Sequence, residues 1–359
     1  MKRIFSFLFA LTVAAAAVAA DAPRLPDYPA VVPGVAFRFP ADHGAHPDFR
    51  TEWWYVTGWL EPEQAPAFGF QITFFRIRPS VDQENPSAFA AKQVLFAHAA
   101  ISDPAEKRLL HDQRAARAGF GLAEASTADM DVLIDDWSLK REPNDRIITK
   151  VSSSEFALDL AFTPTQPILL QGEKGFSRKG PRPEQASHYY SIPHLAVSGT
   201  VKRGTRALRV KGTAWLDREW SSAYLDPRAS GWDWVGFNLD DGGALMAFQI
   251  RGDDGRALWA GGTFRDAQGA ITTFAPEDVR FTTERTWRSP RTGAVYPVER
   301  MLTVRLASGE RTSRITPLFD DQELDSRAGG GPVYWEGAAQ IDGGRGYLEL
   351  TGYFRPLKL

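Results

Sequence analysis

The chain has 359 residues, with 42 basic and 44 acidic side chains and a net charge of −2. Because Lys and Arg do not outnumber Asp and Glu, the chain has no excess positive charge to neutralise the phosphates of a nucleic acid, and we expect no nucleic-acid partner. The absence of cysteine excludes disulfides, thiolate metal sites and a cysteine nucleophile. The length favours two domains, and 11 Trp with 43% hydrophobic residues suffice for cores and an apolar cavity.

The first 20 residues have the pattern of a cleaved signal peptide. Lys2 and Arg3 precede an apolar run over 4–18, which ends in Ala19 and Ala20. A retained membrane helix is the alternative, but it needs about 20 apolar residues. We therefore expect a periplasmic or secreted protein, cut after Ala19 or Ala20. Residues 21–49, rich in Pro, Ala and Asp, are expected to form an extended N-terminal arm.

From residue 50 onward, short runs of alternating apolar and polar residues are separated by Gly, Pro, Asp and Asn, which is typical of antiparallel strands. The chain is therefore predicted to be all-β. Short helices are expected only at 103–117 and 276–279. The clearest strand patterns are 53–60, 69–77, 155–162, 195–201, 207–215, 234–239, 245–251 and 346–353.

An internal repeat predicts the domain organisation. Trp53, Val56 and Leu60 recur as Trp232, Val235 and Leu239. Further matches follow in the same order: 70–72 with 248–250, 95–97 with 258–260, 163–164 with 316–317, 189–190 with 334–335, and Gly212 with Gly352. The matches indicate one β unit over 50–225 and a second over 230–359.

Each unit must hide the edges of its strands, either by closing into a barrel or by stacking two sheets. We favour two tandem lipocalin-like antiparallel β-barrels, since a barrel of about eight strands can hold one hydrophobic ligand. The first barrel is expected to carry the functional cavity. In the second, counting from Gly352 places Arg355 and Leu357 where the first has Trp215 and Asp217, so the acid is lost.

The segment around Asp217 suggests acid chemistry. Strand alternation places Thr213, Trp215, Asp217 and Glu219 on one face. A carboxyl beside indole rings loses solvation and its pKa rises, so Asp217 could act as a general acid. The alternative is that Asp217 and Glu219 form ion pairs with Arg218 or Arg228.

His188 and Tyr190 complete the candidate catalytic set. They share one strand face and are expected to line the same cavity as Asp217, where a histidine can relay protons near neutral pH. A core or rim histidine is the alternative.

The candidate ligand-binding residues are mainly aromatic. Aromatic residues at period two are usually core, and Glu52 could instead close the barrel end through an arginine. We expect no metal and no cofactor: His43 and His46, in the arm, are the only closely spaced histidines, and no Gly-x-Ser-x-Gly or His-Glu-x-x-His motif occurs. The ligand-binding set is Trp215, Glu52, Trp54, Glu219, Trp232 and Trp234.

Several motifs carry a family resemblance. They are 51–55 (Thr-Glu-Trp-Trp-Tyr) with Gly58, 187–191 (Ser-His-Tyr-Tyr-Ser), 212–217 (Gly-Thr-Ala-Trp-Leu-Asp) with Glu219-Trp220, 231–234 (Gly-Trp-Asp-Trp), and 334–337 (Tyr-Trp-Glu-Gly) through 351–353. The chain resembles the AttH-like family of predicted secreted hydrolases, related to carotenoid 1,2-hydratase (hydroxyneurosporene synthase).

The resemblance implies two lipocalin-like barrels. In the hydratase branch, an aromatic-x-Asp motif and a His-x-aromatic motif are implicated in protonating an isolated carbon–carbon double bond. The similar positions in this sequence are Trp215 with Asp217, and His188 with Tyr190.

Two functions follow. The first is an exported protein that encloses a hydrophobic small molecule or lipid in the first barrel and serves an envelope or export pathway, with a membrane transport system as partner. The alternative is a cofactor-independent hydratase, lyase or isomerase that protonates an apolar unsaturated substrate with Asp217.

Overall fold

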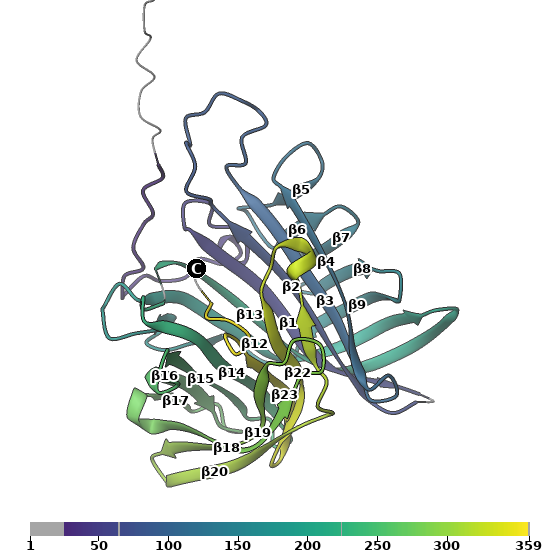
Figure 1. The fold of residues 1–359 in the computed structure, drawn as a ribbon, viewed down its shortest axis with the longest axis vertical. Helices are drawn as coiled ribbons and strands as arrows, with labels where there is room; N and C mark the ends of the chain where they lie inside the picture. The colour runs from purple at the N-terminus through teal and green to yellow at the C-terminus, as the bar shows by residue number, and fades with distance from the viewer. Residues whose placement is uncertain (1–24, 64, 224, 358–359) are drawn as a thin grey trace, which may run out of the picture.

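The computed structural model describes residues 25–63, 65–223 and 225–357, so the expected signal peptide lies outside the described residues. Within these ranges the chain is all-β, with two antiparallel sheets (Figure 1). Short 3-10 turns form η1 (Ala41–His43), η2 (Pro276–Asp278) and η3 (Arg327–Gly329). No helix in this part of the chain is long and apolar enough to span a membrane.

The first sheet has the strand order β4-β3-β2-β1-β13-β12-β9-β8-β7-β6-β5, with β10 and β11 beside β12. Its strands are β1 (Thr51–Pro62), β2 (Phe68–Ile77), β3 (Val94–Asp103), β4 (Arg108–Arg117), β5 (Ala123–Ala125), β6 (Asp131–Ile134), β7 (Trp137–Arg141), β8 (Ile147–Ser152), β9 (Phe156–Pro164), β10 (Leu169–Leu170), β11 (Phe176–Arg178), β12 (Ala186–Arg203) and β13 (Arg206–Ala223).

The second sheet has the order β17-β16-β15-β14-β23-β22-β20-β19-β18, with β21 beside β22. Its strands are β14 (Ala229–Leu239), β15 (Ala244–Gly252), β16 (Ala257–Arg265), β17 (Ile271–Phe274), β18 (Val279–Arg288), β19 (Val295–Leu306), β20 (Gly309–Pro317), β21 (Glu323–Asp325), β22 (Val333–Ile341) and β23 (Gly344–Leu350).

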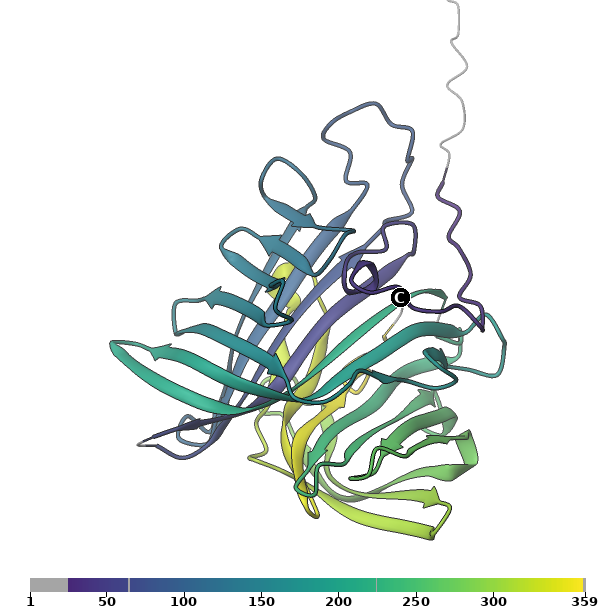
Figure 2. The same cartoon turned by 180° about the vertical axis from the view of Figure 1, so that it is seen from behind.

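The two sheets repeat one topology. In each, four consecutive strands form a meander, and the first strand also pairs with the last, β1 with β13 and β14 with β23. The first sheet curls into a nearly closed barrel (Figure 2), and Arg114 on β4 reaches across it to the ring of Trp137 on β7, at 4.7 Å. The architecture agrees with the predicted tandem lipocalin-like barrels.

Tight hairpins join the last two long strands of each sheet. Gly204 lies between β12 and β13, and Gly343 lies between β22 and β23. Both have positive φ, +55° and +74°, which glycine adopts without strain. The Gly343 turn sets the register that brings Glu349 opposite Glu336. On β12 a register shift between Ile192 and Leu195, further along the ladder from the Gly204 turn, brings Ser191 opposite Asp217.

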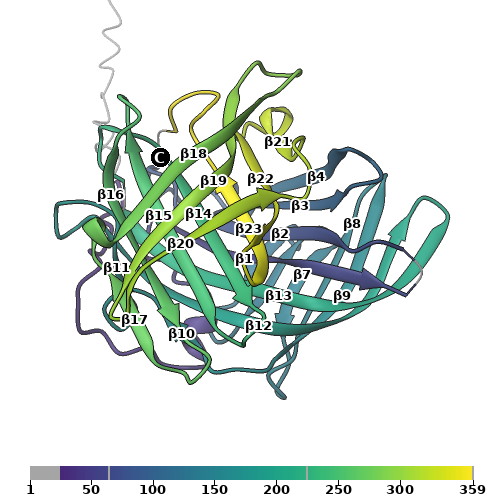
Figure 3. The same ribbon diagram turned by 90° about the horizontal axis from the view of Figure 1, so that it is seen from below.

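Strand alternation divides the apolar residues among separate clusters. On β1, Trp54 and Val56 face the core of the first sheet, whereas Tyr55 and Trp59 face the second sheet. We call the layer of side chains between the two sheets the seam. Its side chains come mainly from β1, β12 and β13 of the first sheet and from β14, β15, β22 and β23 of the second. Figure 3 shows the ribbons of the two sheets lying against each other. Trp59 Nε1 donates to the carbonyl of Gly346 across the seam, at 3.0 Å.

Two local predictions were wrong. Residues 103–117 form the end of β3, a turn and β4, because Lys107 adopts a positive φ and Arg108–Arg117 pairs along β3. The repeat match between 70–72 and 248–250 does not hold either, since Phe70 lies in the first core and Phe248 in the seam.

The short helix expected at 276–279 is present as a single 3-10 turn, η2.

The described part of the arm, from residue 25, packs against the first sheet. His43 and Ala45 are buried. The carbonyl of His43 accepts a hydrogen bond from Trp54 Nε1 at 2.9 Å, and the carbonyls of His46 and Phe49 accept from Arg76 at 2.9 and 2.8 Å. The arm thus covers one end of the first core.

Candidate active site between the two sheets

Asp217 lies in the seam, with 2% of its surface exposed. Its carboxylate oxygens accept hydrogen bonds from Trp215 Nε1 at 2.6 Å, Ser191 Oγ at 2.5 Å and the Tyr189 hydroxyl at 2.6 Å. Trp215 is two residues away on the same strand face, and the two hydroxyls come from β12. The carboxyl is therefore held in a fixed orientation by three donors.

The surroundings of Asp217 favour its neutral form. Burial raises the pKa of Asp217 to about 7, against the three hydrogen bonds, which lower it. Burial, followed by the charge of Asp217, also raises the pKa of Tyr189 well above its usual value. The Tyr189 hydroxyl accepts a hydrogen bond from Trp234 Nε1 of the second sheet at 3.1 Å, which ties Asp217 to both sheets.

The second sheet brings two more carboxyls to the seam, Glu336 on β22 and Glu349 on β23. Glu349 Oε2 accepts a hydrogen bond from Trp232 Nε1 at 2.8 Å. Its side chain keeps partial exposure but its carboxyl lies deep between the sheets, and this burial raises its pKa to about 7. Burial, followed by the charge of Glu349, raises the pKa of Glu336 well above its usual value.

The prediction that the second repeat loses the acid is wrong. Leu60 pairs with Gly212, and its repeat partner Leu239 pairs with Gly344, so Gly344 and not Gly352 corresponds to Gly212. The same register places Glu349 at the position of Asp217. Leu357 lies beyond β23, which ends at Leu350.

His188 and Tyr190 do not share a cavity with Asp217. On the β12–β13 ladder Tyr190 pairs with Arg218, whereas Asp217 pairs with Ser191, so Tyr190 faces the opposite side of the sheet. The Tyr190 hydroxyl hydrogen-bonds His43 Nδ1 at 2.6 Å. The expected set of Asp217 with His188 and Tyr190 is therefore not assembled.

His188 packs inside the first barrel. Its ring lies 5.4 Å from the ring of Trp220. Burial lowers the pKa of His188 to about 4, and burial lowers that of His43 to the same value. Both imidazoles are therefore neutral at physiological pH.

Glu52 and Trp54 also face the first core. Glu52 binds both Arg76 and Arg218, and it accepts the backbone N–H of His46 at 3.0 Å. Burial alone would raise the pKa of Glu52, but the charge of Arg218 holds it well below its usual range. The Arg218 guanidinium lies 4.0 Å from the centre of the Trp54 ring. The alternative in which Glu52 pairs with an arginine is the one the structure adopts.

The other predicted residues lie in the seam or beside it. Glu219 forms a buried ion pair with Lys179 Nζ at 3.1 Å. Neither arginine proposed as a partner for Asp217 binds it, since Arg218 binds Glu52 on the opposite face and Arg228 binds Asp226 at 2.9 Å. Trp215, Trp232 and Trp234 each direct an indole N–H at an acid or at Tyr189.

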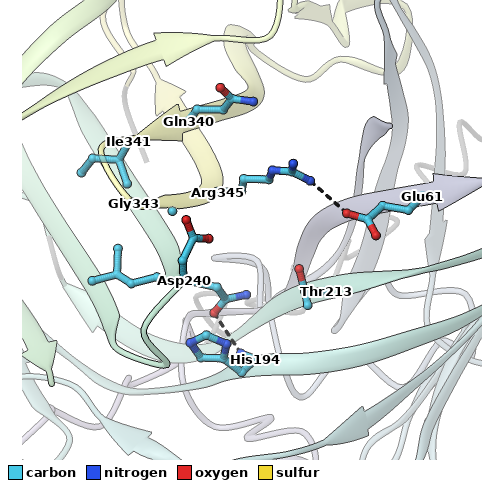
Figure 4. Close-up of a pocket in the computed structure, with 11 residues that line it drawn as sticks. Glu61, His194, Thr213, Asp240, Gln340, Ile341, Gly343 and Arg345 are labelled. Carbon is cyan, nitrogen blue, oxygen red and sulfur yellow. Dashed lines mark hydrogen bonds and ion pairs between the residues drawn. The ribbon is translucent and has the colours of Figure 1, made fainter. Parts of the chain in front are cut away.

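A pocket of about 520 Å³ opens at one end of the seam (Figure 4). Thr213 and Arg345 line this pocket. Thr213 lies four residues before Asp217, and Arg345 lies four residues before Glu349, in each case on the same face of one strand. At the rise of a β-strand, four residues span about 13 Å, which separates the pocket from the acids. Arg345 binds Glu61 across the pocket at 2.9 Å, where Figure 4 shows the two side chains meeting. The remaining lining residues are His194, Asn238, Leu239, Asp240, Gln340, Ile341, Gly343 and Gly344.

The described ranges contain no group of three or more His, Asp or Glu side chains that could hold a metal ion. The groups around the seam acids are hydroxyls and indole N–H groups, which donate hydrogen bonds to the carboxyl oxygens. The site can therefore hold and transfer a proton with the side chains of this chain.

Sequence reasoning missed Tyr189, Ser191, Tyr55, Glu336 and Glu349. A signal for them existed: Tyr347-x-Glu349 repeats the aromatic-x-acid pattern of Trp215-x-Asp217, and Tyr334-x-Glu336 repeats Tyr189-x-Ser191. The repeat anchored on Gly352 concealed this pattern, because it shifted the last strand by eight residues.

The AttH-like family model matches residues 30–353. This chain belongs to the AttH-like family. A crystal structure of an AttH candidate from Nitrosomonas europaea is 57% identical to this AttH-like chain, with a TM-score of 0.85, and the match covers 91% of this chain and 100% of that one.

More distant structures share the fold of this AttH-like chain. Kievitone hydratase from Nectria haematococca has a TM-score of 0.65 at 15% identity, covering 91% of this chain and 96% of that one. CghA with Sch210972 has a TM-score of 0.54 at 11% identity, covering 93% and 96%. No curated protein matches the sequence significantly.

Proposed function

We propose that this chain is an enzyme that protonates a carbon–carbon double bond of an apolar substrate, with Asp217 as general acid. The observation that carries the proposal is the environment of Asp217: a buried carboxyl with a pKa of about 7, fixed by three donors. No Lys or Arg in the described ranges forms an ion pair with it, so its proton is available near neutral pH.

The seam supplies the other features that such a reaction needs. The seam around Asp217 is formed by buried apolar side chains, among them Trp59, Trp215 and Tyr347. An apolar wall excludes competing bases and stabilises the neutral acid. Tyr189, bound to Asp217, holds the carboxyl in place and would stabilise the carboxylate left after proton transfer.

The fold similarity supports this choice over a carrier. A hydratase, kievitone hydratase, has the same fold, so this architecture can house addition of water to a double bond. We therefore favour hydratase, lyase or isomerase chemistry in the seam.

We further propose that the enzyme acts outside the cytoplasm, on the basis of the sequence pattern over 1–20. The intact mass of the protein recovered from the cell envelope tests this, because export predicts the loss of about 20 residues. Recovery of a chain that still begins at Met1 would contradict it.

The reaction is tested by proton exchange with solvent. Purified protein is incubated in D₂O with a panel of polyenes and unsaturated fatty acids, and deuterium incorporation is measured by mass spectrometry. Asp217→Asn should lower the rate at least about 100-fold, the usual contribution of a general acid. Asp226→Asn, a buried acid outside the seam, is the matched control. Equal exchange by wild type and Asp217→Asn would overturn the assignment.

A further inference from the structure

The seam contains two carboxyls at equivalent positions of the repeat. Asp217 pairs with Tyr55 on β1, and Glu349 pairs with Trp234 on β14. On the adjoining ladders, Asp217 pairs with Ser191 and Glu349 with Glu336. The internal duplication therefore places one acid on each side of the same interface.

The two halves interlock around these acids. Trp234, the ladder partner of Glu349, donates to Tyr189, which donates to Asp217. Tyr55, the ladder partner of Asp217, lies beside Glu336 of the second sheet. The rings of Tyr55 and Trp234 meet edge to face, with centroids 5.3 Å apart. Asp217 is thus connected to the second sheet through Tyr189 and Trp234, and Glu336 contacts Tyr55 of the first sheet.

Two polar groups from opposite sheets meet at the same place. The Tyr55 hydroxyl and the Glu336 carboxyl contact each other, and their residues are 7% and 2% exposed. This contact places a phenol and a carboxyl, both able to hydrogen-bond a water, in the seam that holds the two acids. Glu349 is more exposed than Asp217, so its side chain lies nearer to solvent.

We propose that Glu349 is the second proton-transfer carboxyl of the reaction and that the reaction is reversible hydration of the double bond. This inference rests on the proposed function of Asp217 and assigns the co-reactant, water. Glu349 is assigned as the base because its side chain is the more exposed of the two acids and comes from the opposite sheet.

The step balances without any other reagent. Asp217 gives its proton to one alkene carbon, and the π electrons form the new C–H bond. The water oxygen bonds to the other carbon, and the Glu349 carboxylate takes the proton that the water loses. Return of this proton to Asp217 restores the site, and the reverse sequence eliminates water from an alcohol.

Two isotopes separate the roles of the acids. For a substrate that exchanges deuterium, hydration in H₂¹⁸O is followed by mass spectrometry for wild type, Glu349→Gln and Asp226→Asn. Glu349→Gln should lower ¹⁸O incorporation at least about 100-fold, while deuterium exchange driven by Asp217 falls less. Glu349→Asp keeps the carboxyl and should restore part of the ¹⁸O signal. Asp226→Asn, which lies outside the seam and pairs with Arg228, should retain most of it.

The outcomes distinguish this inference from the proposed function. If wild type exchanges no deuterium with any substrate, the proposed function fails. If exchange and ¹⁸O incorporation are the same in wild type and Glu349→Gln, only the assignment of Glu349 fails. Titration of the Asp217 carboxyl by ¹³C NMR provides a measurement without substrate: its pKa should fall in Glu349→Gln, since a neighbouring negative charge is removed, and an unchanged pKa would contradict the coupling.

Discussion

Asp217 and Glu349 occupy the same position in two copies of one β unit, and both point into the layer between the copies. The equivalence follows from the ladders, in which Tyr55 pairs with Asp217 and Trp234 pairs with Glu349. A duplicated fold that packs on itself along β1, β13, β14 and β23 buries both acids together. Their raised pKa values are a consequence of this packing.

The adjacent residues Tyr189 and Tyr190 test which face of β12 is functional. Tyr189 donates to Asp217 in the seam, and Tyr190 contacts His43 in the first barrel. Tyr189→Phe should lower turnover about 10-fold or more, because the acid loses a donor that orients it. Tyr190→Phe should leave deuterium exchange within about 2-fold. The opposite ranking in steady-state rates would move the site into the barrel.

Stability should depend on pH through the seam acids. The folded-state pKa values of Asp217 and Glu349, about 7, exceed their unfolded values near 4, so the folded state binds more protons in this window. The free energy of unfolding should therefore fall as pH rises from about 4 to 7, by at most about 1.4 kcal/mol per pH unit for each acid.

Urea unfolding between pH 4.5 and 7.5 measures this effect. Asp217→Asn should lose part of the slope, so its stability relative to wild type should rise with pH. Parallel profiles for the two proteins would show that Asp217 has an ordinary pKa.

The buried ion network of the first barrel should be important for folding. Glu52 binds Arg76 and Arg218, and Glu52→Gln would leave two buried guanidinium groups without their counter-charge. We expect a loss of about 3–5 kcal/mol in the free energy of unfolding. Glu61→Gln, which removes an exposed pair with Arg345, should cost less than about 1 kcal/mol. Equal melting temperatures for the two variants would contradict the assignment.

Docking of the two sheets depends on a close approach at Gly69. A Cβ at this position would lie 2.5 Å from the Cβ of Ala338 and 2.6 Å from the Tyr347 hydroxyl, both on the second sheet. Gly69→Ala should therefore lower the free energy of unfolding by about 1–3 kcal/mol. Chemical denaturation measures this, and wild-type stability in the variant would mean that the seam adapts freely.

The sequence predicted the all-β class and the repeat because period-two alternation and glycine turns are local signals. It also identified Asp217 and Trp215, which share a strand face. It could not show whether that face points into a barrel or into the seam, since both environments are apolar. His188 and Tyr190 were therefore assigned to the wrong side of the sheet relative to Asp217, and Glu349 was missed because its repeat register depends on strand pairing.

The most direct test of the account is the titration of Asp217 itself. Protein labelled with ¹³C at aspartate carboxyls is followed by NMR from pH 4 to 8, and the resonance missing in Asp217→Asn identifies the residue. The account predicts a pKa of about 7, so that the carboxyl keeps its proton well above pH 5. A midpoint near the usual value for aspartate, about 4, would show that Asp217 is ionised at neutral pH and cannot be the proton donor.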